Sequence, residues 1–158
     1  MLVFDASSII YAWDNYPVSQ FPGLWSWIRD GINQGHIQMP AVAFAEVEHP
    51  ADECAGWLND SGLNRIAMTN EILLDAMRIK RLLGILDDKY GSGVGENDLF
   101  IIATAKASQA ILVSDERVQA GLPKLMANYK IPAVCKMQEV RVECISFLEF
   151  IKRSGAVF

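Results

Sequence analysis

The sequence has few cysteines and no long hydrophobic run. Its three cysteines, Cys54, Cys135 and Cys144, form no CxxC pair, so they indicate neither a disulfide framework nor a zinc site. No stretch of about eighteen or more apolar residues, the length of a membrane-spanning helix, occurs in the chain. The N-terminus lacks the basic and apolar segments of a signal peptide. We therefore expect a cytoplasmic protein without a membrane segment.

Positive charge is also scarce. The formal net charge is −5, whereas a protein that coats nucleic acid needs an excess of Lys and Arg to neutralise phosphates. This charge does not exclude a nuclease, because acids that bind cations handle a polyanion through the ions. The 158 residues, 51% of them hydrophobic, suffice for one core, and no Pro/Gly/Ser-rich linker divides them. We expect a single domain over residues 1–158.

Short β-rich apolar runs alternate with longer segments of helical periodicity. This pattern is typical of a parallel sheet covered by helices on both faces. The predicted strands are 2–4, 37–39, 65–68, 110–114 and 142–145. The predicted helices include a long one at 70–89, a nearly uniformly apolar and therefore buried one from 97 or 98, and short ones near 122–126 and 132–137. We predict a three-layer α/β fold with a central, mainly parallel sheet of about five strands.

Three glycines, at positions 91, 93 and 95, follow the long predicted helix. They do not form a phosphate-binding loop, because they follow a helix instead of a strand and no Gly-Lys-Ser/Thr accompanies them. We predict a mobile loop near the functional edge of the sheet, able to admit a substrate.

Acidic residues stand beside the apolar runs that should form or cover the sheet. Asp5 follows the first predicted strand, and Asp115 and Glu116 follow the fourth. Asp98 precedes an apolar helical run, and Glu46 lies in the helix after the second strand. An open α/β fold brings such positions into one cleft at the carboxyl edge of its sheet. Clustered carboxylates repel one another unless a cation such as Mg²⁺ or Mn²⁺ compensates, so the pattern predicts a metal-dependent phosphodiesterase.

Each acid also has a simpler explanation. Asp98 could only cap a helix, since Asp is a preferred capping residue, and Glu46 could be a solvated helix residue. Asp5 is harder to dismiss, because it directly follows a buried strand, and the same holds for the pair after the fourth strand. The prediction of a metal site therefore depends on the conjunction of these acids.

The acids occur within four ordered motifs: Asp5-Ala-Ser7-Ser8-Ile-Ile, Glu46 after the second strand, Asp98-Leu-Phe-Ile-Ile-Ala103-Thr-Ala105, and Leu112-Val-Ser114-Asp115-Glu116. Their order, over nearly the whole chain, resembles that of the PIN-domain ribonuclease superfamily. Further segments are similar to an uncharacterised prokaryotic PIN-like branch related to toxins of toxin–antitoxin systems, namely Tyr16-Pro17, Phe21-Pro22-Gly-Leu24-Trp25 and Lys130-Ile-Pro132-Ala-Val-Cys135.

The resemblance implies a PIN-like fold and a Mg²⁺- or Mn²⁺-dependent endoribonuclease, most often the toxin half of a toxin–antitoxin pair. The implied partners are an RNA substrate, a cognate antitoxin protein and a second copy of the chain in a homodimer. The resemblance also implies that Asp5, Glu46 and Asp98 are the first three metal-binding acids.

The fourth acid stays open between two neighbours. The family pattern of Thr, any residue and Asp aligns Ser114 with the Thr and Glu116 with the Asp, which leaves Asp115 in the variable position. Successive side chains after a strand point in different directions, so we expect one acid to face the ions and the other to face solvent. Ser7 matches a small polar residue of the first motif, and its hydroxyl could orient Asp5, bind a phosphate oxygen or cap a helix.

Two rival functions also stay open. The Glu at the fourth position favours a non-catalytic PIN-like module that binds RNA or protein. A DNA-directed nuclease of the same fold is equally compatible, because metal ions contact phosphate and ignore the base. Basic residues of the last third, Lys124, Lys130, Lys136 and Arg141, should mostly be solvated, although some could line an RNA-binding rim.

Overall fold

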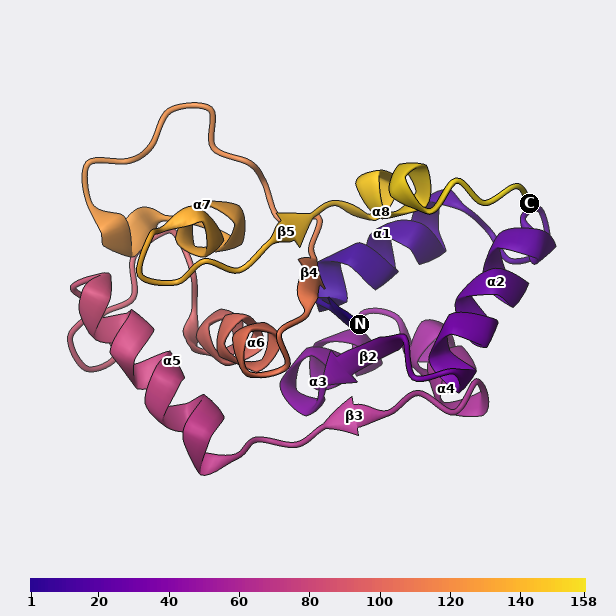
Figure 1. The fold of residues 1–158 in the computed structure, drawn as a ribbon, viewed down its shortest axis with the longest axis horizontal. Helices are drawn as coiled ribbons and strands as arrows, with labels where there is room; N and C mark the ends of the chain where they lie inside the picture. The colour runs from indigo at the N-terminus through magenta and orange to yellow at the C-terminus, as the bar shows by residue number, and fades with distance from the viewer.

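The computed structural model describes all residues from Met1 to Phe158. Five strands form one sheet in the order β3-β2-β1-β4-β5, and all neighbouring strands are parallel (Figure 1). The strands are β1 (Leu2–Phe4), β2 (Ile37–Pro40), β3 (Arg65–Ile66), β4 (Ile111–Val113) and β5 (Cys144–Ile145). The predicted parallel sheet of five strands is therefore confirmed.

Eight α-helices and one 3₁₀ turn connect and cover the strands. They are α1 (Ala6–Asn15), α2 (Pro22–Asn33), α3 (Ala41–Glu48), α4 (Asp52–Asp60), α5 (Asn70–Leu82), α6 (Glu96–Ala107), η1 (Met126–Asn128), α7 (Ile131–Lys136) and α8 (Phe147–Ser154). The chain moves one way across the sheet from β1 to β3 and the other way from β3 to β5. Because parallel crossovers are almost always right-handed, the helices between β1 and β3 and those between β3 and β5 belong to opposite faces, whereas α8, which follows β5, packs against α1.

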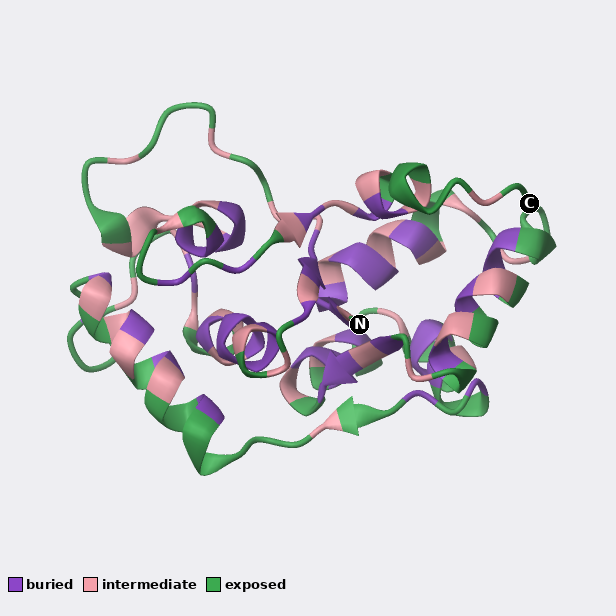
Figure 2. Cartoon of the chain, viewed as in Figure 1, coloured by how far each residue is buried: buried purple, intermediate pink, exposed green.

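The core lies around the two central strands. Val3 and Phe4 of β1 and Leu112 and Val113 of β4 have no exposed surface. Helix α6 packs across β1, β2 and β4, which explains why its sequence is apolar on nearly every side. Figure 2 shows buried residues along these strands and on the inner faces of the helices. None of the helices combines the length and the apolarity needed to cross a membrane.

The long helix predicted at 70–89 is shorter than expected. Helix α5 ends at Leu82, and Gly84 follows with φ of +71°, a left-handed conformation that ends a helix. Leu86, within the predicted range, lies outside the helix and is 70% exposed. Thr69 caps the start of α5, because its side chain accepts a hydrogen bond from the Ile72 amide.

The helix predicted at 122–126 is wrong. The chain from 114 to 125 has no helix or strand, and only the η1 turn follows it. Pro123 gives a physical reason, because a proline disfavours the helical conformation of the residue before it.

The glycines after α5 serve close packing. A Cβ atom at Gly93 would lie 2.2 Å from the Tyr129 carbonyl oxygen, and one at Gly91 would lie 2.2 Å from Asn128 Oδ1. The Val94 amide donates to the Tyr129 carbonyl at 2.9 Å, and Val94 is buried. The predicted mobile loop is therefore a segment packed against residues 127–129, where side chains would not fit.

Candidate metal centre

The topology creates a crevice at the carboxyl edge of the sheet. β1 lies between β2 and β4, and the chain reverses its direction across the sheet after β3. Ligands of open α/β folds bind where the strand order reverses, outside the carboxyl ends of the strands. Asp5 directly follows β1 and Ser114 directly follows β4, so both residues border this crevice.

Asp5 is a buried carboxylate, 3% exposed, with one oxygen held in place. Its Oδ2 accepts hydrogen bonds from Ser7 Oγ at 2.6 Å and from Ser114 Oγ at 2.9 Å. Its Oδ1 has no hydrogen-bond partner. Every side-chain nitrogen or oxygen that is fully buried has a partner, so Oδ1 is still accessible to solvent. The carboxylate is thus oriented through one oxygen and presents the other.

The two serine hydroxyls also join the start of α1 to the segment after β4. Ser7 Oγ accepts from the Asp115 amide at 3.0 Å, and Ser114 Oγ accepts from the Glu116 amide at 3.2 Å. The two Oγ atoms lie 3.3 Å apart. Of the roles considered for Ser7, the structure shows the contact that orients Asp5. The contribution of Ser114 was visible in the sequence only as a motif match.

Asp98 lies in the first turn of α6, which runs back from the carboxyl edge. Its Oδ2 accepts from the Gly95 amide at 2.8 Å, so the simple helix-capping contact is present and uses one oxygen. Burial raises the pKa of Asp98 to about 6, and the negative charges of Asp5, Glu46 and Glu116 add to this rise, while the Gly95 bond opposes it. Acids from three other segments therefore act on Asp98.

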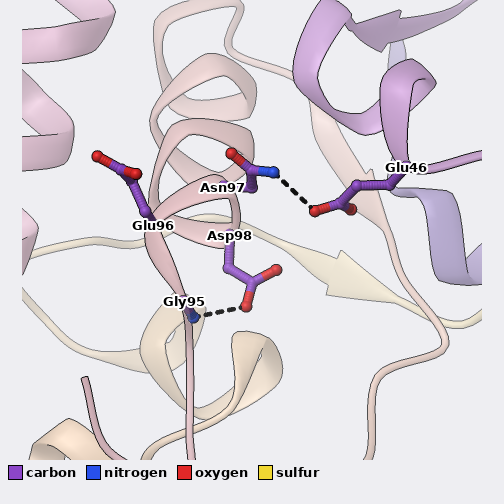
Figure 3. Close-up of a pocket in the computed structure, with 5 residues that line it drawn as sticks. All are labelled: Glu46, Gly95, Glu96, Asn97 and Asp98. Carbon is purple, nitrogen blue, oxygen red and sulfur yellow. Dashed lines mark hydrogen bonds between the residues drawn. The ribbon is translucent and has the colours of Figure 1, made fainter. Parts of the chain in front are cut away.

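Glu46 is a half-buried residue of α3 that faces α6. Asn97 Nδ2 donates to Glu46 Oε1 at 3.0 Å, and Figure 3 shows Asn97 and Asp98 directed toward Glu46, whereas Glu96 points away. Burial raises the pKa of Glu46, with smaller contributions from Asp5 and Glu116. Asn97 was not predicted as a site residue. Its only signal was its place beside Asp98 at a helix start.

A small polar cavity separates α3 from the start of α6. It measures about 280 Å³ and contains no apolar side chain in its lining. The lining residues are Glu46, Gly95, Glu96, Asn97 and Asp98. Such a cavity suits a hydrated ion or a phosphate group better than an apolar ligand.

The structure separates the two adjacent acids after β4. Asp115 Oδ2 accepts from the Phe147 amide at 3.1 Å, at the start of α8, so this carboxylate is turned to a helix end instead of open solvent. Glu116 Oε2 lies 3.8 Å from Lys130 Nζ, and its charge contributes to the raised pKa values of Asp98 and Glu46. Glu116, unlike Asp115, therefore belongs electrostatically with Asp98 and Glu46.

The donor atoms at this edge fit a hard divalent cation in chemistry. Burial and neighbouring acids make the carboxylates of Glu46 and Asp98 costly to ionise, and Mg²⁺ or Mn²⁺ would offset this cost. Together with Asp5 and Glu116 they make four carboxylates. They share an edge but not a closed ligand shell, since no group of three or more Asp, Glu, His or Cys side chains stands close enough together to hold an ion. Glu46, Asp98 and Glu116 are each held by one contact, to Asn97, Gly95 and Lys130 respectively.

Comparison with known proteins supports the fold. A family model described as "Domain of unknown function (DUF4411)" matches residues 2–158. No curated protein matches the chain. The structure is similar to one described as VapBC2 from Rickettsia felis bound to a DNA fragment from their promoter, with a TM-score of 0.51 and 19% identity, over 73% of this chain and 86% of that one. At this identity the likeness shows the fold, and it confirms the predicted PIN-like architecture.

Proposed function

The chain belongs to the DUF4411 family of unknown function, and we propose that it is a metal-dependent endoribonuclease that cleaves RNA phosphodiester bonds. The observation that supports this proposal is that Asp5, Glu46 and Glu116, from three separate segments, act electrostatically on Asp98 of a fourth segment at the carboxyl edge of a PIN-like sheet. The negative charges of Asp5, Glu46 and Glu116 oppose ionisation of Asp98 in the metal-free protein, and a bound cation would offset this repulsion.

We assign Asp5 Oδ1 and the carboxylates of Asp98 and Glu116 as the principal metal ligands, with Glu46 completing the set. One or two bound Mg²⁺ or Mn²⁺ ions would supply an activated water and charge stabilisation at the scissile phosphate. Ser7 and Ser114 orient Asp5, and Asn97 orients Glu46. Asp115 fixes the start of α8 and is not assigned to the metal.

The test is RNA cleavage in Mg²⁺, in Mn²⁺ and in EDTA. Wild type should cleave with either ion and not in EDTA, and Asp5→Asn should lose cleavage while keeping the fold by circular dichroism. Asp60→Asn, which removes an exposed acid at the end of α4, is the matched control and should cleave like wild type. Full activity of Asp5→Asn would refute the assignment. Parallel assays with single-stranded DNA decide between RNA- and DNA-directed cleavage.

We further propose that the chain is the toxin half of a toxin–antitoxin pair and acts as a homodimer. This rests on the likeness to VapBC2, a complex whose structure includes promoter DNA, together with the motif resemblance described above. Expression of the chain alone should arrest growth, and co-expression of a small protein encoded directly upstream should relieve the arrest. A cleavage-competent chain that leaves growth unaffected would contradict this part of the proposal.

A non-catalytic module is the second candidate, favoured by the open arrangement of the carboxylates and by Glu at the fourth position. A competent site should gain stability from the ion, by about 2.7 kcal/mol at a concentration one hundred times Kd. Thermal melts with increasing Mn²⁺ measure this gain. An unchanged Tm in wild type would favour the non-catalytic module.

A further inference from the structure

The segment that follows Glu116 forms a loop beside the acidic edge. Residues 117–130 contain no strand or helix except the η1 turn, and Figure 1 shows the first part of this segment as an arch that projects beyond α7. Loops longer than about 12–15 residues are uncommon in compact domains and are usually functional or disordered. The hydrogen bonds at the base of this loop indicate order.

The base of the loop is closed by the Gln119 side chain. Its Nε2 donates to the Asn128 carbonyl at 3.1 Å, and its Oε1 accepts from the Lys130 amide at 2.9 Å. Lys130 Nζ lies 3.8 Å from Glu116 Oε2, so both ends of the loop meet at the acidic edge. The loop is therefore fixed at its base and continuous with the candidate metal centre.

The charge of the loop is opposite to that of the protein. Residues 117–130 include Arg117, Lys124 and Lys130 and no acid, in a chain of net charge −5. Arg117 and Lys124 are exposed, and only Lys130 has an acidic partner. This local excess of positive charge lies beside the acidic edge, where a polyanion bound at the metal centre would extend onto the loop.

The loop also exposes large apolar side chains. Val118 is 66% exposed, Leu122 61%, Leu125 67% and Met126 41%. Figure 2 shows most of the arch as exposed. A loop that needed only solubility would not present cations and apolar side chains together, so this composition points to a ligand with both charged and apolar parts.

We propose that the loop 117–130 binds the unpaired strand of RNA beside the scissile phosphate, with its cations on phosphates and its apolar side chains on base faces. The inference rests on the proposed nuclease function. The cavity at the acidic edge has no apolar side chain that could contact a base, whereas the adjoining loop has four. A duplex hides its base faces by stacking, so only an unpaired strand satisfies both kinds of loop side chain.

The test is the binding of a fluorescent single-stranded oligoribonucleotide, measured by anisotropy in EDTA so that cleavage plays no part. The loop variant is Lys124→Gln/Leu125→Ala. The control is Lys152→Gln/Leu74→Ala, which removes the same atoms from α8 and α5, and Leu74 is 65% exposed against 67% for Leu125.

The loop variant should bind the single strand about fivefold more weakly, the lower end of what stacking of one base on an aromatic ring contributes, and the control should bind like wild type. The slope of log K against log salt should fall by about 0.7 for the lost phosphate contact, a change that a merely structural role would not produce. Duplex RNA of the same length should lose less affinity than the single strand.

Equal affinities of the loop variant and the control would overturn the proposal, as would equal weakening for single-stranded and duplex RNA. A loop variant that changes only the oligomeric mass would show a protein contact instead, and would also overturn it. A wild type that binds but does not cleave would refute the proposed nuclease and leave the loop assignment standing, so the two failures are distinguishable.

Discussion

The acidic edge has two halves that are built differently. In the fixed half, made of Asp5, Ser7 and Ser114, a buried carboxylate receives two hydroxyl hydrogen bonds. In the adjustable half, made of Glu46, Asp98 and Glu116, each carboxylate is only partly buried and has a single partner. The fixed half can therefore define the position of a cation, and the adjustable half can close around it. This would explain why the four acids influence one another electrostatically although they form no closed ligand shell.

Breaking the fixed half should have a large effect on metal affinity. Ser114→Ala removes one of the two donors to Asp5 Oδ2, and loss of such a supporting contact typically lowers metal affinity or activity by about 10–100-fold. Ser114→Thr keeps the hydroxyl and should restore most of the activity. Mn²⁺ affinity from thermal melts and cleavage rates measure both variants.

Ser8→Ala is the matched control for this prediction. Ser8 is a buried serine whose Oγ donates to the Asp5 main-chain carbonyl instead of its carboxylate, and that carbonyl also accepts from the Ser8 amide. Its removal should lower stability without changing Mn²⁺ affinity. Equal losses of affinity in Ser8→Ala and Ser114→Ala would show that the hydroxyl on the carboxylate has no special role.

The adjustable half should limit the stability of the metal-free protein. The pKa of Asp98 is raised to about 6, chiefly by burial, so the folded state binds its proton more tightly than the unfolded state. Stability from this group is present at low pH and is lost as pH rises from about 4 to about 6. At pH 7 in EDTA, Asp98→Asn should therefore be more stable than wild type by about 3 kcal/mol, and in Mg²⁺ its cleavage should be lost.

Melts from pH 4 to pH 7 check this prediction. The difference in Tm between Asp98→Asn and wild type should grow with pH, because only wild type has the carboxylate at position 98. The control Asp60→Asn removes one negative charge from an exposed site and should show no comparable growth. A difference that is constant over this range would mean that the pKa of Asp98 is not raised in the folded protein.

A smaller effect is expected from the contact between α6 and α3. Asn97→Ala removes the donor to Glu46 Oε1, which is an exposed hydrogen bond, so cleavage should fall by less than about tenfold. Asn97→Asp should be worse for cleavage because its charge repels Glu46, yet it should stabilise α6, whose N-terminus favours an acid. Lower activity together with a higher Tm would show that Asn97 acts by positioning Glu46 and not by stabilising the fold.

The sequence predicted the edge better than the details within it. Alternating strands and helices imply parallel order, which brings Asp5 and Ser114 to the same edge of the sheet, so the general location followed from local patterns. That they end neighbouring strands depends on the strand order, in which β4 pairs with β1. The end of α5 did not follow from local patterns, because the helical spacing of apolar residues continues past Gly84 to Leu86. The left-handed backbone of Gly84 nevertheless stops the helix. Periodicity identified apolar positions but not the conformation of one glycine.

Contacts between distant segments were the other limit. Gly93 was interpreted as a source of mobility, whereas its close neighbour is Tyr129, 36 positions away in the chain. Asn97 and Lys130 looked like ordinary surface residues until the fold placed them against Glu46 and Glu116. Such partners depend on three-dimensional packing, which a single sequence does not contain.

The same limit left open whether Asp115 or Glu116 is the fourth metal-binding acid. Substitution of each acid decides between them, with the smallest expected effect on stability. Asp115 accepts from the Phe147 amide at the start of α8, and an Asn there can still accept this hydrogen bond. Burial and the charge of Asp5 raise the pKa of Asp115, although the Phe147 bond opposes this rise, so Asp115→Asn should not lower stability at pH 7 and should retain cleavage. Glu116→Gln should instead lose cleavage and lower the raised pKa values of Asp98 and Glu46, because its charge contributes to both. If Asp115→Asn abolished cleavage while Glu116→Gln retained it, the ligand set would include Asp115, and α8 would then have to release that carboxylate when the metal binds.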